Sequence, residues 1–143
     1  MIKRFSEGEY KLRPAIGSDL NFIYSTWLDS YRYDSSLGKS CRNSTFYPNY
    51  QLVIDHILAR ASVVVVCMPD QEKVIFGYLV YESKILHYCF VKQAFRELGL
   101  AGVMWREAVC PLVHTHKTLG AEPILLNHKE FVFNPFMLFK GVE

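Results

Sequence analysis

The pattern of apolar and polar residues predicts a strand and two helices in the first 61 residues. Residues 9–14 alternate in polarity and end at a proline, which is typical of a strand. A helix should follow with Ser18 as its N-cap, and Pro48 suits the first turn of a second helix. The polar segment 32–47, rich in Ser and Asn, predicts a long loop between them. The apolar faces comprise Leu20, Ile23, Tyr24, Trp27, Leu28 and Tyr31, then Tyr50, Val53, Ile54, Ile57, Leu58 and Ala61.

The periodicity changes to that of strands at residue 62. Residues 62–68 are rich in β-branched side chains, which favours a buried strand. The polar run 69–73 predicts a turn, and 74–82 should be the hairpin partner. Residues 84–91 predict a further strand. The middle of the chain is therefore expected to form three consecutive strands.

The last third predicts alternating helices and strands. Helical spacing returns over 94–111, where a proline closes the helix. We expect a strand over 112–117, a short helix over 123–129 and a final strand over 131–138. The element order is then β-α-α-β-β-β-α-β-α-β, a mixed α/β fold. Without an internal repeat or a linker, residues 1–143 are expected to form a single domain.

The composition is that of a globular protein. Half of the residues are apolar and 21% are charged, which argues against a disordered or fibrous chain. The net charge of +2 and the pI near 8.3 are only mildly basic, so charge alone does not indicate nucleic acid. A modest positive field would nonetheless suit a polyanionic ligand.

The cysteines indicate a reducing compartment. Cys41, Cys67, Cys89 and Cys110 lie more than twenty residues apart, with no CxxC pair or metal-type spacing. No metal site is expected. The chain shows no signal-peptide pattern and no apolar run long enough to span a membrane. We therefore expect a soluble, cytoplasmic protein without membrane contact.

One segment carries the pattern of a phosphate-binding turn. A strand ends at Val91, a short loop follows, and a helix is expected to start near Gly99. Backbone N–H groups at the start of a helix lack partners within it and attract anions. Gly99 and the small Ala101 would let the backbone approach a ligand, and Arg96 would contact a phosphate oxygen. The alternative is a packing glycine beside a solvated arginine.

The run Arg96-x-x-Gly99-x-Ala101 resembles the acetyl-CoA signature Q/R-x-x-G-x-G/A of the GCN5-related N-acetyltransferases. Val91 stands five residues earlier, where that family has an aliphatic residue, and Phe95 is also common in its loop. The order of elements is similar to that of the family over nearly the whole chain, whereas the similarity in motif covers about twenty residues. The resemblance implies that acetyl-CoA is the cosubstrate. It also implies the cofactor-binding residues, which are Phe90, Val91, Arg96, Glu97, Leu98, Gly99, Leu100 and Ala101.

The same resemblance implies a mechanism of direct acetyl transfer to a primary amine. A main-chain N–H near Phe90–Val91 would stabilise the oxyanion, and a general base would deprotonate the acceptor. His87, nine residues before Arg96, is the candidate base, with Glu82 as second choice. Alternatively, His87 is packed in the sheet and Glu82 lies at a solvent-facing strand end.

The sequence departs from the family in its general acid. Many members use a tyrosine after the fifth strand, but no tyrosine follows Tyr88. His114, His116 and His128 are possible substitutes or surface residues. The alternative that the protein binds acetyl-CoA without turnover, or does not bind acetyl-CoA, stays open.

Two further hypotheses concern partners. Thr115–Thr118 and Phe133–Phe136 resemble segments of small acetyltransferase-like proteins of bacteriophages. Such a protein would act in the host cytoplasm as a binding module or an inhibitor of a host protein. A nucleic-acid modifying relative is the third hypothesis, because cations and aromatic residues interleave at Tyr31, Arg32, Tyr33, Lys39, Arg42 and Phe46. The amine acceptor and the choice between monomer and homodimer are left open.

Overall fold

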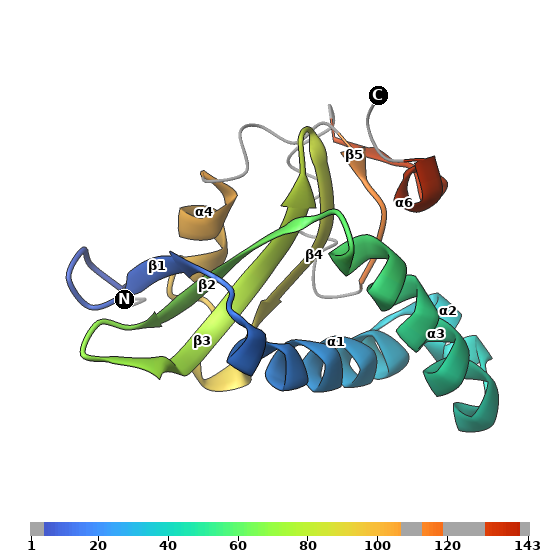
Figure 1. The fold of residues 1–143 in the computed structure, drawn as a ribbon, viewed down its shortest axis with the longest axis horizontal. Helices are drawn as coiled ribbons and strands as arrows, with labels where there is room; N and C mark the ends of the chain where they lie inside the picture. The colour runs from blue at the N-terminus through green and yellow to red at the C-terminus, as the bar shows by residue number, and fades with distance from the viewer. Residues whose placement is uncertain (1–4, 107–112, 119–130, 141–143) are drawn as a thin grey trace.

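A computed structural model describes residues 5–106, 113–118 and 131–140. Its centre is one six-stranded sheet in which the strands follow sequence order (Figure 1). Neighbours are antiparallel from the first strand to the fourth, and the last two strands each run parallel to the strand before. The strands are β1 (Lys11–Pro14), β2 (Ser62–Met68), β3 (Gln71–Glu82), β4 (Ile85–Val91), β5 (Val113–His114) and β6 (Val132–Phe133).

Helices cover both faces of the sheet (Figure 1). Successive residues of β2 point to opposite faces, so Val65 packs with Trp27 and Ile54 while Val66 packs with the helix after β4. This arrangement confirms the predicted mixed α/β fold class. The helices are η1 (Gly17–Asp19), α1 (Leu20–Asp34), α2 (Ser36–Ser40), α3 (Asn43–Leu58), η2 (Gln93–Phe95), α4 (Leu100–Trp105) and α6 (Met137–Lys140).

The predictions for the first four strands hold with small shifts. The prediction for 62–68 matches β2 in both bounds, whereas the turn predicted over 69–73 is too long because β3 already begins at Gln71. The final strand predicted over 131–138 is also too long. β6 ends at Phe133, where Asn134 accepts a hydrogen bond from Phe136 N at 3.1 Å and leads into α6.

The loop predicted over 32–47 is wrong. α1 continues to Asp34, α2 fills the centre, and α3 already starts at Asn43. The polar residues act as caps instead: Ser35 Oγ donates to the Tyr31 carbonyl at 2.5 Å and accepts from Gly38 N at 3.0 Å. Serine content therefore marked helix boundaries here, not an extended loop.

Two predicted helix starts are also corrected. Ser18 does not cap α1; the Asp19 carboxylate accepts from Ile16 N at 2.8 Å and is held by Arg13 in a buried ion pair at 2.7 Å. Pro48 lies inside α3 and not in its first turn.

The helix predicted over 94–111 begins later than expected. Only a 3₁₀ turn occupies 93–95, and α4 starts at Leu100. β5 is shorter than the strand predicted over 112–117. The helix predicted over 123–129 lies outside the described residues. Within the described ranges, no helix is both long enough and apolar enough to cross a membrane.

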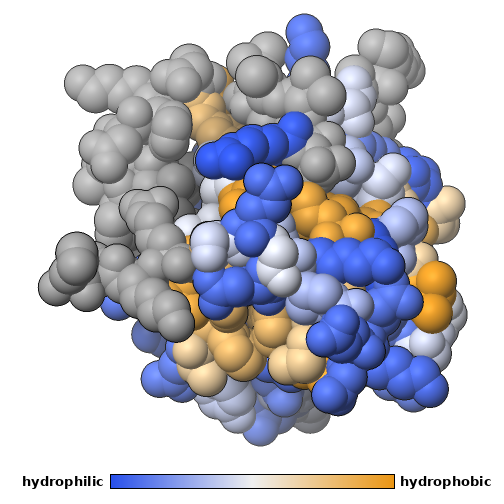
Figure 2. All heavy atoms as spheres, turned by 90° about the vertical axis from the view of Figure 1, so that its left-hand side faces the viewer, coloured by the Kyte–Doolittle hydropathy of each residue, from blue (hydrophilic) through white to orange (hydrophobic). Residues whose placement is uncertain are grey.

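The face that carries the β2–β3 turn is mainly hydrophilic. Figure 2 shows apolar side chains there in small areas separated by hydrophilic ones. Scattered exposed apolar groups are normal for a globular surface. The described part of this face therefore offers no broad apolar surface.

The contact between α1 and α2 depends on the absence of a side chain at Gly38. A Cβ built there would lie 2.4 Å from the Tyr31 carbonyl oxygen and 2.5 Å from that of Arg32. We expect Gly38→Ala to lower the free energy of unfolding by roughly 1–3 kcal/mol in urea denaturation. Gly17→Ala is the control, because a Cβ there meets nothing within 4 Å. Equal effects of the two substitutions would contradict the close approach.

Candidate active site

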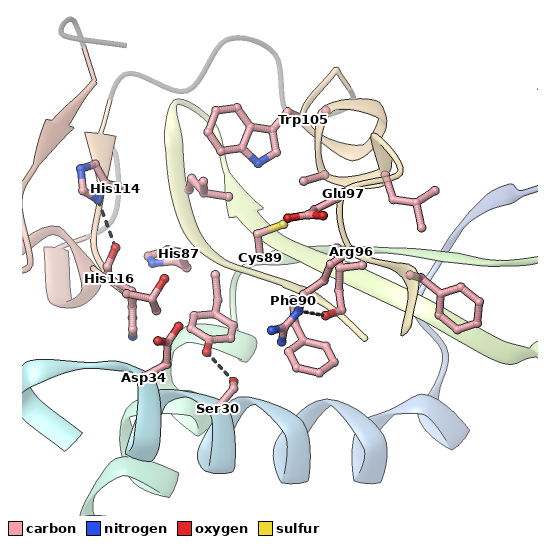
Figure 3. Close-up of a pocket in the computed structure, with 18 of the residues that line it drawn as sticks. Ser30, Asp34, His87, Cys89, Phe90, Arg96, Glu97, Trp105, His114 and His116 are labelled. Carbon is pink, nitrogen blue, oxygen red and sulfur yellow. Dashed lines mark hydrogen bonds between the residues drawn. The ribbon is translucent and has the colours of Figure 1, made fainter. Parts of the chain in front are cut away.

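The site lies where the pairing between β4 and β5 ends. Among the described residues, two pairs join these strands, Ile85 with Val113 and Leu86 with His114. Two backbone hydrogen bonds accompany them, Val113 N to Lys84 O at 3.1 Å and Thr115 N to Leu86 O at 3.2 Å. Next to these pairs is a cavity of about 560 Å³, lined by residues of α1, β4, α4, β5 and the loop before α4 (Figure 3). A cavity of this volume is in the usual range for a small-molecule site.

A β-bulge in β4 turns peptide groups toward this cavity. Val80 pairs with Tyr88 but Tyr81 pairs with Leu86, so His87 is an extra residue in β4. Before the bulge, Leu86 directs its carbonyl to β5. Directly after β4, Lys92 N donates to Phe76 O of β3 at 2.8 Å. Because the N–H and carbonyl groups of successive residues in a strand point to opposite sides, those of Val91 point away from β3, to the cavity side.

The segment between β4 and α4 forms a tight turn beside the cavity. Glu97 and Gly99 have positive φ angles of 66° and 86°, and α4 begins directly after Gly99. Arg96 Nε donates to Val91 O at 2.8 Å, with the guanidinium 6.0 Å from the centroid of the Phe90 ring. The turn thus holds the arginine across the end of β4.

The structure brings together most of the predicted cofactor-binding residues. Leu98 does not line the cavity; its carbonyl accepts a hydrogen bond from Phe5 N at 3.0 Å. The predicted residues that line the cavity are Phe90, Val91, Arg96, Glu97, Gly99, Leu100 and Ala101.

The two predicted catalytic residues are in contact with each other. His87 lines the cavity and is buried, and its Nε2 lies 3.1 Å from Glu82 Oε1. Glu82 lies behind the histidine, not in the cavity lining, and Arg60 Nε donates to both carboxylate oxygens at 2.9 and 3.0 Å. Burial acts to raise the pKa of Glu82, but the hydrogen bonds from Arg60 and His87 outweigh it and lower that pKa.

The other side of His87 contacts Thr115, a residue that the sequence did not single out for chemistry. His87 Nδ1 lies 2.8 Å from Thr115 Oγ1, and the same hydroxyl lies 2.8 Å from His116 Nδ1. Burial lowers the pKa of His87, while Glu82 opposes this shift. His87 is therefore held at both ring nitrogens, between a carboxylate and a hydroxyl.

His116 is packed among aromatic rings of the core. It lies edge-on to Tyr31 with ring centroids 5.0 Å apart, and to Trp27, Tyr50 and Tyr88 at 5.7–5.8 Å. Burial lowers its pKa to about 3, so the ring is neutral at physiological pH.

His114 is also buried, and its Nδ1 lies 3.1 Å from the His116 carbonyl. Burial lowers the pKa of His114 as well. His114 and His116 both line the cavity, and His128 lies outside the described residues.

Two residues of α1 complete the cavity on the side opposite Trp105 and Glu97 (Figure 3). Ser30 and Asp34 both line it, and Ser30 Oγ is 2.5 Å from the hydroxyl of Tyr88. Neither residue was among those predicted from the sequence. Their spacing of four residues, on a helix with an apolar face, was the available signal.

Among the cation–aromatic residues near 32–47, Arg32 is engaged with two neighbouring residues. Arg32 Nε donates to Asn43 Oδ1 at 2.9 Å, and its guanidinium lies 5.2 Å from the centroid of the Tyr33 ring. Among the described residues, no cluster of three or more His, Cys, Asp or Glu side chains could hold a metal ion.

The architecture is that of the GCN5-related N-acetyltransferase fold. It is similar to the solution structure of apo YjaB from Escherichia coli, with a TM-score of 0.59 and 11% identity. That likeness covers 85% of this chain and 80% of the other.

Two further solved structures are similar. One is described as a GCN5-related glucosamine N-acetyltransferase region in a fungal multi-domain β-N-acetylglucosaminidase (TM-score 0.57, 12% identity, 88% of this chain, 17% of that chain). The other is a putative acetyltransferase from Pyrococcus horikoshii, with a TM-score of 0.52 and 12% identity. That likeness covers 87% of this chain and 44% of the other. No protein-family model and no curated protein matches the sequence. Identity at this level shows the fold alone, so any function has to be argued from the site.

The buried histidines predict acid sensitivity. Since the pKa values of His87, His114 and His116 are lowered on folding, the unfolded chain binds more protons below its histidine pKa of about 6.5. We expect the free energy of unfolding to fall from pH 7 to pH 5, by up to about 1.4 kcal/mol per pH unit for each neutral histidine. Below about pH 4.5, protonation of Glu82 removes further stability.

Urea denaturation of the wild type and of His116→Gln across this pH range measures the effect. The loss of unfolding free energy that comes from altered packing in the variant is measured at pH 8, where His116 is neutral in both the folded and the unfolded chain. The variant should then show a shallower pH dependence, and an unchanged slope would contradict a neutral His116 in the fold.

Proposed function

We propose that the protein is an acetyl-CoA-dependent N-acetyltransferase that acts on a primary amine. The observation that carries the proposal is the cavity beside the short β4–β5 pairing, which joins the tight turn before α4 to the open edge of β4. Arg96 and the tight turn around Gly99 lie at this cavity, which also has His87 in its lining. A ligand with phosphates and a thioester would use both parts.

The donor would lie along the open edge of β4. Phosphates would contact Arg96 and the backbone N–H groups at the start of α4, and the pantetheine arm would follow the peptide groups left without strand pairing. Val91 N–H, on the cavity side, would donate to the thioester carbonyl. That donor would stabilise the oxyanion of the tetrahedral intermediate.

Transfer would be direct, without an acyl-enzyme. Cys89 is the cysteine in the cavity lining, and burial raises the pKa of its thiol to about 12, so it is not a thiolate at neutral pH. The amine nitrogen would attack the thioester carbon, the C–S bond would break, and CoA would leave as a thiolate. The amine loses one proton and the thiolate gains one.

His87 would hold that proton between the two steps. The Glu82 carboxylate stabilises a positive charge on the imidazole, while Arg60 keeps the carboxylate ionised and in place. The amine would enter from the side of Ser30 and Asp34. An acidic side chain at that position would attract a cationic acceptor.

Acetyl-CoA binding tests the donor site. Ala101 lines the cavity, whereas Ala94 is exposed in η2 and lies outside the lining, so Ala101→Glu and Ala94→Glu add the same side chain at two contrasting positions. We expect saturable binding by calorimetry for the wild type and for Ala94→Glu. Ala101→Glu should weaken binding at least tenfold, because a carboxylate would displace the ligand and repel its phosphates.

Turnover separates an enzyme from a binding module. Release of free CoA should be measured with a panel of primary amines that includes a lysine peptide, a diamine and an amino sugar. Binding without turnover for every amine would favour the non-catalytic alternative.

In the binding experiment, equal affinity of both glutamate variants for acetyl-CoA, or no binding by the wild type, would contradict the donor site.

A further inference from the structure

We propose that Thr115 is a positioning residue that connects His87 and His116 in one proton relay, so that a proton reaches His87 only through the threonine hydroxyl. The catalytic role of the relay rests on the proposed function. The positions of the protons in the relay do not depend on that function. The relay explains how His87 could act as a base although both of its ring nitrogens already have hydrogen-bond partners and neither can contact a substrate directly.

The charge of Glu82 fixes the direction of every hydrogen bond in this chain. An ionised carboxylate only accepts, so His87 carries its proton on Nε2 and leaves Nδ1 as an acceptor. The Thr115 hydroxyl therefore donates to His87 Nδ1. Since a hydroxyl has one proton, its oxygen must accept from His116, which then carries its proton on Nδ1.

Proton uptake reverses this order without breaking a contact. One proton enters at His116 Nε2, the Nδ1 proton of His116 moves to Thr115 Oγ1, and the hydroxyl proton moves to His87 Nδ1. His87 is then a cation, Thr115 is again a hydroxyl, and His116 is neutral with its proton on Nε2. The reverse sequence would deliver the proton to the CoA thiolate, which would serve in place of the absent tyrosine acid.

The surrounding charges favour His87 as the place where the proton is held. Glu82 of β3 faces it directly, whereas Arg60, after α3, opposes a second positive charge nearby but is itself paired with Glu82. Asp34 of α1 lines the same cavity as His116, but burial and the neighbouring His87 and His114 act against a positive charge on the His116 ring, which is packed among aromatic rings. His116 therefore conducts the proton and does not store it.

The relay is tested by ¹⁵N NMR of the histidine rings in the full-length protein. The wild type at pH 7.5 should show His87 protonated on Nε2 and His116 on Nδ1. Thr115→Val keeps the shape but removes the hydroxyl, and His116 should move toward the Nε2–H form because its Nδ1–H loses the acceptor. Thr115→Ser restores a hydroxyl and should restore the wild-type pattern.

Kinetics supply the second readout. Thr115→Val should lower kcat for acetyl transfer roughly 10²-fold with the KM for acetyl-CoA unchanged, and Thr115→Ser should recover most of it. His116 protonated on Nε2 in the wild type, or full kcat in Thr115→Val, would overturn the relay. If the wild type transfers acetyl to no amine, the proposed function fails, and the ring tautomers alone then support or overturn the proton order.

Discussion

The short pairing between β4 and β5 is the constraint on which the rest of the site depends. Two residue pairs join the strands, and the side chains of His87 and Thr115 extend that contact by one hydrogen bond. The peptide groups beyond it then lie beside a cavity. A longer pairing would satisfy those groups within the sheet and would leave no edge for a ligand. The position of the cavity thus follows from where the strand pairing stops.

The bulge at His87 links this constraint to the chemistry. One extra residue changes which peptide groups of β4 face β3, so the cavity receives those after the bulge. The same residue is held between Glu82, at the end of β3, and Thr115, which directly follows β5. Backbone donors and a titratable side chain are therefore positioned by the same irregularity of one strand.

Strongly periodic segments of the sequence were sufficient to predict the sheet and the two long helices, and the motif from Arg96 to Ala101 located the cavity. The loop over 32–47 was mispredicted because serine favours caps and loops alike, and only the tertiary contact at Gly38 decides between them. Thr115 was missed for a different reason. Its importance comes from two histidines that it meets in space, 28 residues away and next to it in sequence, and no local pattern marks that contact.

The proposed donor site consists of the open edge of β4 and the turn before α4, where acetyl-CoA would bind. Amide chemical-shift mapping of the ¹⁵N-labelled protein during titration with acetyl-CoA tests it most directly, because each N–H reports separately. We expect saturable shifts that are largest at Val91, Gly99, Leu100 and Ala101, with small changes in α3. Shifts centred elsewhere, for instance in a second cavity whose lining includes Ile16, Leu20 and Leu58, or no saturable shift, would contradict binding at the donor site.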